Sequence, residues 1–473
     1  MDEIADRLMG VYGKCPKSIQ TMGINLVDTR EWLINNSGPV SRNLELLQRA
    51  QGWSDEQFSE YQDSRLRQIL RFAYDEIPFY KRLYKGQNVD ISGIRTAKDL
   101  AKLPTISKRD VVSNWKDFVP QRRIRSKLSY TSGTTGTPLM VRVSRDCWEV
   151  NRASSLLRND WAGHRGEAIA RFVGDRPVTD CSDKRLFRRS YVMNRLFFPS
   201  YCLSPQTFPR IFDALVGQKV QFLQCYPSTA FILAKFLQER DKYLPLKALL
   251  FSSEPMFEFQ RDLIEERFRA RAFGFYGQAE QILSASQCEK GNYHLAMIDG
   301  ILEVLRGDEA VSPGEEGLTV ATTLCNFAMP LIRYRLDDFT GFEGRKCGCG
   351  RNSPTIYPIE AKSDDIIITP EGAMISPSTL TFPFKHLEHI LESQIVQKAP
   401  DRLVIRIVPE DGFSSDDESK LIDSFRAYVG KNMTIEVERV SEIHQSGSFK
   451  KRFVVSELGG SAYDWVRTDH KSI

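Results

Sequence analysis

Residues 130–138 read Tyr-Thr-Ser-Gly-Thr-Thr-Gly-Thr-Pro, and this stretch decides how the rest of the chain is interpreted. Five Ser/Thr hydroxyls and two glycines stand together within residues 131–137. Glycine lets backbone N–H groups turn toward an anion, and the hydroxyls add donors without a fixed charge. Apolar residues flank the run, so it predicts a loop between two strands that suits a polyphosphate. A flexible surface loop has the same composition, and the lysine of the kinase-type phosphate loop is absent.

Length, charge and cysteine usage narrow the class of protein. The 473 residues are enough for two or three domains, and the net charge of +4 predicts no large nucleic-acid surface. The acidic start lacks the apolar core of a signal peptide, and no apolar run of about 18 residues predicts a membrane span. Nine scattered cysteines favour a reducing, cytoplasmic location, and only those from Cys288 onward are expected to cluster.

The first three-quarters of the chain has the pattern of an α/β protein. Apolar spacing predicts helices within 44–87 and 145–162. Short buried strands are predicted at 248–252 and 271–276. Because strands and helices alternate up to about residue 330, we expect parallel α/β sheets.

The pattern changes after residue 361. Strands are predicted at 404–408 and 434–438, on either side of a helix near 415–430. This pattern indicates a small α+β unit. We therefore predict a large domain over 1–361 and a small one over 362–473.

The run at 130–138 resembles the phosphate loop of the adenylate-forming enzymes, the acyl- and aryl-CoA ligases and their relatives. Further motifs follow in the family's order up to about residue 457. They are most similar to the phenylacetate–CoA ligase-like branch, which includes the CapK-like ligases of capsule loci. The resemblance implies a large adenylation domain with parallel sheets and a small, mobile C-terminal lid domain.

The pentapeptide at 276–280, Tyr-Gly-Gln-Ala-Glu, resembles the family motif Tyr-Gly-x-[Ser/Thr]-Glu. The resemblance implies that Tyr276 packs on adenine and that Glu280 is catalytic and holds Mg²⁺. Ala279 stands where the family has a hydroxyl residue, which removes one polar contact to phosphate. A structural turn at the end of a strand is the alternative.

Residues 329–338 end in Arg-Leu-Asp-Asp and resemble the family's Tyr-Arg-x-Gly-Asp. The resemblance implies that Asp338 accepts hydrogen bonds from the ribose hydroxyls, since a carboxylate has only acceptors. Asp337 replaces the glycine, and a surface acidic pair is the alternative. The residues with an implied nucleotide-binding role are Ser132, Gly133, Thr134, Thr135, Gly136, Glu254, Tyr276, Gly277, Gln278 and Asp338.

Two segments resemble the acyl pocket of the phenylacetate–CoA ligase branch. Ser253 and Glu254 stand where the branch has Gly-Ala-Glu-Pro, and the segment Cys-Tyr-Pro-Ser at 225–228 resembles its pocket helix. Tyr226, Ser228 and Ser253 are therefore the implied substrate-pocket residues. An N-capped helix would have the same pattern.

The family's C-terminal lysine bridges the carboxylate and the α-phosphate. An alignment on the strand 452–456 puts Lys450 at that position, with Lys451 in reserve. An alignment on Gly447 puts Ser448 there instead and implies an enzyme with impaired catalysis. We favour Lys450 because this register preserves more of the strand. Asp364 is the implied hinge.

Three thiols and one imidazole form a candidate metal site. Cys288 and His294 stand six positions apart, and Cys347 and Cys349 follow downstream of Asp338. Three Cys and one His make a closed structural zinc set, and these positions resemble a pairing of segments in the ligase branch. Free thiols are the alternative.

The resemblance implies an ATP-dependent, AMP-forming ligase that activates a carboxylic acid as acyl-AMP and passes it to coenzyme A. The acceptor could instead be a carrier-protein thiol, an amine or a sugar hydroxyl. A degenerate nucleotide-binding scaffold and a zinc-stabilised interaction module are the other readings. A homodimer is a further candidate assembly, and no nucleic-acid partner is expected.

Overall fold

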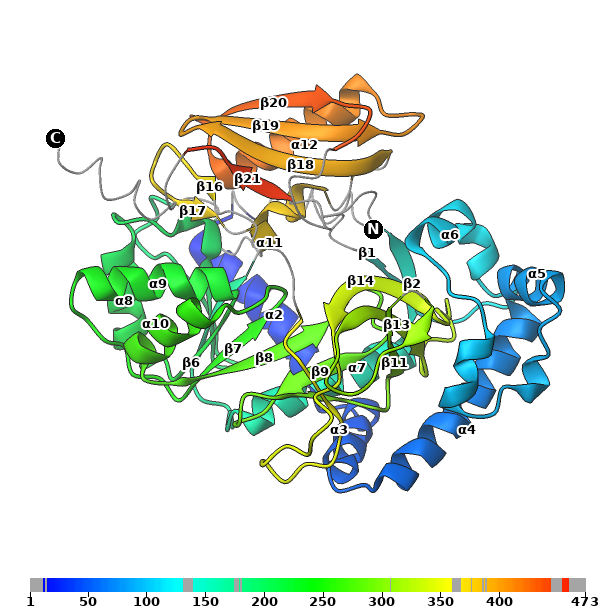
Figure 1. The fold of residues 1–473 in the computed structure, drawn as a ribbon. Helices are drawn as coiled ribbons and strands as arrows, with labels where there is room; N and C mark the ends of the chain where they lie inside the picture. The colour runs from blue at the N-terminus through cyan, green and yellow to red at the C-terminus, as the bar shows by residue number, and fades with distance from the viewer. Residues whose placement is uncertain are drawn as a thin grey trace.

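The protein is described here by a computed structural model, in which a smaller C-terminal domain lies over a larger N-terminal part (Figure 1). The described residues are 12, 15–130, 139–173, 178, 181–306, 308–359, 367–375, 377–384, 387, 389–443 and 453–458. None of the helices in these ranges is long and apolar enough to cross a membrane.

The N-terminal quarter is helical, as the sequence predicts for 44–87. Its helices are α2 (Lys17–Asn35), α3 (Gly38–Ala50), α4 (Asp55–Glu76), α5 (Pro78–Gly86) and α6 (Lys108–Ser113), with 3₁₀ turns η1 (Ile91–Gly93), η2 (Ala97–Lys102) and η3 (Trp115–Phe118). Ser54 caps α4 through a capping box with Gln57. The helix ends before Ile77, whose β-region backbone is the conformation favoured before a proline.

A nine-stranded mixed sheet forms the centre of the N-terminal part. Its strands are β3 (Ile169–Val173), β4 (Arg188–Ser190), β5 (Arg195–Pro199), β6 (Phe222–Cys225), β7 (Ala248–Ser252), β8 (Arg271–Gly277), β9 (Ser284–Gln287), β10 (Tyr293–Leu295) and β15 (Thr355–Ile356). The order is β15-β10-β9-β8-β7-β6-β3-β5-β4. The five strands from β8 to β5 run parallel, which confirms the predicted parallel α/β sheet, whereas the strands at both edges are antiparallel.

Four helices accompany this sheet: α7 (Arg145–Trp161), α8 (Phe208–Gly217), α9 (Pro227–Glu239) and α10 (Glu258–Phe268). Helix α7 confirms the helix predicted at 145–162. Buried side chains of α8, α9 and α10 share one apolar cluster with β6 and β7, and these helices lie together in Figure 1. Helices on a parallel sheet are what its apolar strands require.

A second sheet and a hairpin complete the N-terminal part. The sheet is antiparallel, in the order β12-β11-β13-β14, and consists of β11 (Gly300–Arg306), β12 (Glu309–Ala310), β13 (Gly317–Thr323) and β14 (Tyr334–Thr340). The hairpin pairs β1 (Ser126–Tyr130) with β2 (Met140–Ser144). These two strands flank the predicted phosphate loop, whose residues 131–138 lie outside the described ranges.

The C-terminal domain is a small α+β unit, as predicted. It comprises β16 (Ile367–Ile368), β17 (Met374–Ile375), α11 (Pro377–Leu380), η5 (Phe382–Phe384), β18 (Ile390–Ala399), β19 (Arg402–Pro409), α12 (Ser415–Val429), β20 (Thr434–Arg439) and β21 (Val454–Ser456). Its main sheet has the order β20-β19-β18-β21. The predicted boundary at 361/362 falls among residues that are not described, so it stays a prediction.

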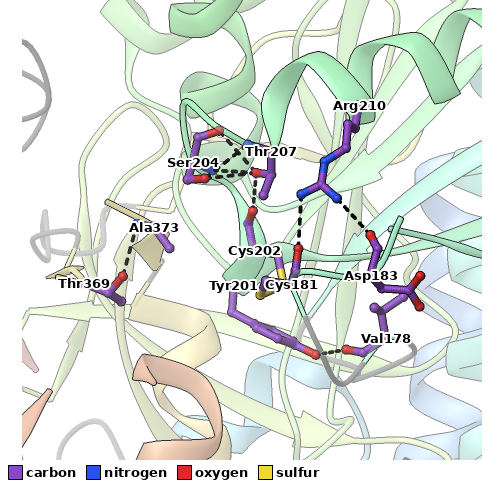
Figure 2. The surroundings of a disulfide bond; sticks show 10 residues. All are labelled: Val178, Cys181, Asp183, Tyr201, Cys202, Ser204, Thr207, Arg210, Thr369 and Ala373. Carbon is purple, nitrogen blue, oxygen red and sulfur yellow. Dashed lines mark hydrogen bonds between the residues drawn. A yellow bond between two sulfur atoms is a disulfide. The ribbon is translucent and has the colours of Figure 1, made fainter. Parts of the chain in front are cut away.

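A disulfide joins Cys181 to Cys202, and the prediction that only cysteines from Cys288 onward come together is therefore wrong. Cys181 follows β3, and Cys202 ends the 3₁₀ turn η4 (Ser200–Cys202) that follows β5. Because β3 and β5 are parallel neighbours, their carboxyl ends meet at the same edge of the sheet. The fold thus pairs two cysteines that are 21 residues apart in the sequence (Figure 2).

Candidate functional site

Two motif residues meet where the two sheets of the N-terminal part adjoin. Tyr276 lies at the end of β8, and Asp338 lies on β14. The hydroxyl of Tyr276 donates to Oδ2 of Asp338 at 2.7 Å. A contact between residues 62 positions apart holds the tyrosine ring and the carboxylate in one place.

Glu280 lies beside this pair and is buried. The hydroxyl of Tyr334, at the start of β14, donates to its Oε1 at 3.3 Å. Burial raises the pKa of Glu280, Lys108 opposes this effect, and the Asp338 carboxylate raises the pKa further. Two acidic groups thus interact within one site, an arrangement that a bound cation would stabilise.

The turn that carries Gln278 links Tyr276 to Glu280. Oε1 of Gln278 accepts a hydrogen bond from the backbone N–H of Leu283 at 3.4 Å. Gly277 is exposed, and a Cβ there would come within 2.9 Å of the Phe275 ring. Close packing therefore favours glycine at this position.

Glu254 lies at the N-terminus of α9. One of its oxygens accepts the backbone N–H of Ser228 at 3.1 Å, so a carboxylate from the neighbouring strand end caps the helix. Ser253 has a φ of 72°, and this left-handed residue turns the chain directly before Glu254. Helix α9 and Glu254 follow the adjacent parallel strands β6 and β7, which explains why they meet.

Tyr226 and Ser228 flank the same helix start. Both are buried, at 7% and 6% exposure, whereas Ser253 is exposed. The Oγ of Ser228 is buried and has no hydrogen-bond partner among the described residues. A buried hydroxyl without a partner is costly, so this atom fits a place where a ligand is bound.

Cys288, His294, Cys347 and Cys349 converge, with one ligand atom of each lying within 4.8 Å of the others. The Sγ atoms of Cys288 and Cys347 are 3.7 Å apart, and Sγ of Cys349 is 3.2 Å from Nε2 of His294. Zinc–sulfur bonds of about 2.3 Å place two sulfur ligands of a tetrahedral site about 3.8 Å apart. The four donors thus fit a closed zinc set in both chemistry and spacing.

The imidazole of His294 is already oriented for such a role. Its Nδ1 contacts the carbonyl oxygen of Ser353 at 3.1 Å, which leaves Nε2 facing Cys349. Burial lowers the pKa of His294 to about 4, so the ring is neutral at neutral pH. The backbone N–H of Lys290 also donates to Sγ of Cys288 at 3.3 Å.

Charged and aromatic contacts fix the loop that carries the last two cysteines. Arg351 pairs with both carboxylate oxygens of Glu289, at 3.1 and 2.8 Å. The same guanidinium lies over the ring of Trp161 and donates to Gln51. The cluster is therefore tied to α7 and to the end of α3 as well as to its own two segments.

Several predicted site residues lie outside the described ranges, and their roles stay predictions. These residues are Ser132, Gly133, Thr134, Thr135, Gly136, Asp364 and Lys450, together with the alternatives Ser448 and Lys451. Phe453, next to this last group, is buried in the core of the C-terminal domain.

The sequence interpretation did not single out Tyr334 and Lys108, which accompany Glu280. Tyr334 lies within the motif at 329–338, so its position was a usable signal. Lys108 is the first residue of α6, and Ile106 near it pairs with β14. Only the folded chain brings this lysine to the acidic pair.

Comparison with known proteins connects this geometry to a family. Residues 367–457 match the CapK C-terminal domain. The chain is 26% identical to a phenylacetate–coenzyme A ligase of Thermus thermophilus over 341 residues, covering 68% of this chain and 74% of the relative. It is also 26% identical to the Escherichia coli phenylacetate–coenzyme A ligase over 379 residues, covering 71% of this chain and 78% of the relative.

A solved structure extends the likeness to the fold. The structure of 2-hydroxyisobutyryl-CoA ligase, in complex with 2-HIB-AMP and CoA, matches with a TM-score of 0.55 at 20% identity. The match covers 90% of this chain and 94% of that one. Over about two-thirds of its length the chain is thus similar to the phenylacetate–CoA ligases, and residues 367–457 are similar to CapK, as the motifs predict.

The chain has most of the motifs of the adenylate-forming enzymes, and two of its departures from them lie next to the site. Ala279 stands between Gln278 and Glu280, so no side-chain hydroxyl is available there. Asp337 precedes Asp338 on β14, where the family has glycine. The contacts of Tyr276, Asp338 and Glu280 are formed despite both changes.

Proposed function

We propose that this protein is an AMP-forming ligase that activates a carboxylic acid with ATP and transfers the acyl group to coenzyme A. The observation that carries the proposal is the meeting of Tyr276, Asp338 and Glu280 at the junction of the two sheets. The ligase relatives, which align over 68–71% of this chain, support the same reaction.

Nucleotide binding is assigned to the groups around the end of β8. The ring of Tyr276 would pack on adenine, while its hydroxyl orients Asp338 to accept the ribose hydroxyls. Gln278 shapes the turn below them, and the backbone at Gly277 leaves room for close approach. Glu254 would line the same pocket from the end of β7 while it caps α9.

The phosphates would be held by the hydroxyls and N–H groups of the loop at 132–136. Such donors stabilise anions by hydrogen bonding, without carrying a fixed positive charge. Mg²⁺, when bound, would offset charge on the phosphates, and the fit rests on the buried Glu280 carboxylate beside Asp338.

In the first half-reaction, a carboxylate oxygen of the acid attacks the α-phosphorus of ATP and pyrophosphate leaves. Lys450 would stabilise the negative charge that develops at the α-phosphate. Tyr226, Ser228 and Ser253 would contact the acid, and the buried Ser228 hydroxyl offers it an unused hydrogen bond. In the second half-reaction, the thiol attacks the acyl carbon and AMP leaves.

The two half-reactions need different groups at one site. A C-terminal domain over 362–473 that turns about Asp364 would remove Lys450 and admit the thiol. The similarity of 367–457 to the CapK C-terminal domain supports assigning this role to that part of the chain.

A structural zinc ion bound by Cys288, His294, Cys347 and Cys349 is the metal that best fits the second cluster. Four protein donors leave no open coordination position for a substrate. The ion would therefore stabilise the fold locally and take no part in the reaction. A cytoplasmic location, a homodimer and an acyl carrier protein as acceptor also remain proposals.

The test supplies the purified protein with ATP, Mg²⁺ and a panel of carboxylic acids, with and without coenzyme A. Acid-dependent release of pyrophosphate, followed by coenzyme A-dependent release of AMP, is the expected result. Turnover with hydroxylamine but not with coenzyme A would assign an acceptor other than coenzyme A. No pyrophosphate with any acid, despite ATP binding, would favour the degenerate scaffold.

A further inference from the structure

The disulfide between Cys181 and Cys202 lies where the C-terminal domain rests on the N-terminal part (Figure 2). Cys202 is almost fully buried, at 1% exposure, in an apolar cluster that otherwise consists almost wholly of C-terminal residues. Cys181 packs against the same cluster. The disulfide is thus part of the surface of the N-terminal part that contacts the C-terminal domain.

The turn η4 contacts the C-terminal domain directly. The ring of Tyr201 meets the ring of Tyr428 of α12 edge to face, with centroids 5.8 Å apart. The hydroxyls of Ser200 and Thr379 lie 3.3 Å apart in the buried interface. Strand β17 also packs on η4, so all three residues of η4 take part in docking.

Hydrogen bonds hold the backbone on each side of the disulfide. Arg210 of α8 donates to the carbonyl oxygens of Cys181 and Asp183, at 3.2 and 3.0 Å. The hydroxyl of Thr207 donates to the carbonyl oxygen of Cys202. These bonds do not need the sulfur–sulfur link, so the two thiols would stay close after reduction and could pair again.

The two sulfur atoms differ in access. Cys181 is partly exposed, whereas Cys202 is buried. An incoming thiolate can therefore reach Cys181, bond to its sulfur and release the sulfur of Cys202. The second thiol of the reductant then frees Cys181, so that the dithiol becomes a disulfide and the protein gains two electrons and two protons as two thiols.

We propose that the Cys181–Cys202 bond is a reversible redox switch, opened by a dithiol reductant, that sets how firmly the C-terminal domain docks. Two unbonded sulfur atoms need a wider separation than a bonded pair. In a closely packed interface that extra room has to come from a shift of η4, which weakens its contacts with Tyr428 and Thr379. The proposal does not depend on the ligase activity.

The first measurement counts free thiols in the full chain after denaturation without reductant. Seven cysteines lie outside the bond, so seven thiols should be alkylated before reduction and nine after it. Alkylation of all nine in the unreduced protein, after exposure to a mild disulfide oxidant, would overturn the proposal.

The second measurement follows amide hydrogen exchange in the oxidised and dithiothreitol-treated protein. Exchange in η4, β17 and α11 should rise about ten- to a hundredfold on reduction, because the cross-link no longer restrains local opening. The hairpin of β9 and β10 should not change, since it lies in a different part of the sheet. Equal exchange at η4, β17 and α11 in both states would contradict the switch.

Matched variants separate the bond from side effects of the reductant. Cys181→Ser alters the partly exposed cysteine. With or without dithiothreitol, the amides of this variant should exchange at the faster rate of the reduced wild-type protein. Cys15→Ser removes a free thiol outside the pair and should respond as the wild type does. A Cys181→Ser protein that still responds to dithiothreitol would place the redox effect elsewhere.

Discussion

The proposed nucleotide site and the thiol cluster are built from the same two stretches of chain, yet they differ in chemistry. One stretch runs from β8 to β10 and carries Tyr276, Glu280 and His294. The other runs from β14 to β15 and carries Asp338 and the last two thiols. The nucleotide site brings acidic groups together, whereas the thiol cluster brings together four neutral or soft donors.

The difference shows what each site requires. Burial and the nearby Asp338 carboxylate raise the pKa of Glu280, so a bound cation or ligand donors would add to the stability of this site. The thiol cluster would bind the proposed zinc ion with protein donors alone. Changes in the first site should therefore alter catalysis, and changes in the second should alter stability.

Lys450→Ala should have the largest effect on catalysis. Removing one preorganised donor to a developing charge costs about 10²–10³ in rate, and acyl-AMP formation should fall by that factor. Acid-dependent pyrophosphate release measures it, with Lys451→Ala as the matched control. If Lys451→Ala loses activity while Lys450→Ala does not, the alignment is off by one residue.

Asp338→Asn should rank next. A hydrogen bond to a charged group contributes about 1.5–3 kcal/mol, so kcat/KM for ATP should fall roughly 10- to 150-fold. The KM for ATP should rise more than the KM for the carboxylic acid. An unchanged KM for ATP would mean that Asp338 does not bind the ribose.

Tyr276→Phe tests the contact that joins the two sheets at the site. The substitution keeps the ring and the Asp338 carboxylate but removes the donor that orients it. Because the ribose contact itself is kept, only part of the about 1.5–3 kcal/mol of a hydrogen bond to a charged group should be lost, roughly 2- to 10-fold in kcat/KM. Tyr276→Ala, which also removes the ring, should lose more. Equal losses in the two variants would argue against stacking on adenine.

Cys349→Ser should have the smallest effect on catalysis. The purified wild type should carry about one zinc ion per chain, and the variant should lose it while kcat changes little. The melting temperature should fall by about 5 °C, as expected when a structural metal site that stabilises one region of a large domain is lost. A wild-type protein with no metal, or a variant that loses kcat without losing stability, would remove the distinction between the two sites.

The sequence indicated candidate residues of the proposed nucleotide site more fully than it indicated their contacts. Tyr276 and Asp338 are recognisable because each stands in a short motif at a strand. The helix cap supplied by Glu254, by contrast, depends on β6 and β7 being neighbours in the sheet, and no local pattern specifies that. The pairing of Cys181 with Cys202 escaped prediction for the same reason, since the adjacency of β3 and β5 creates it.

The thiol cluster was predictable because it is largely local. Cys288 and His294 stand on either side of a tight turn between β9 and β10, and Cys347 and Cys349 are two residues apart. Only the meeting of these two pairs needs the whole fold. The contacts that orient His294 through Ser353 were beyond the reach of spacing arguments.

The most direct test of the proposed chemistry follows oxygen from the acid. A carboxylic acid that the protein accepts as a substrate is labelled with heavy oxygen in its carboxylate. It is incubated with the protein, ATP, Mg²⁺ and coenzyme A, and the products are analysed by mass spectrometry. Attack of the carboxylate on the α-phosphorus predicts one heavy oxygen in AMP and none in pyrophosphate. Heavy oxygen in inorganic phosphate, with ADP as the nucleotide product, would contradict an AMP-forming ligase.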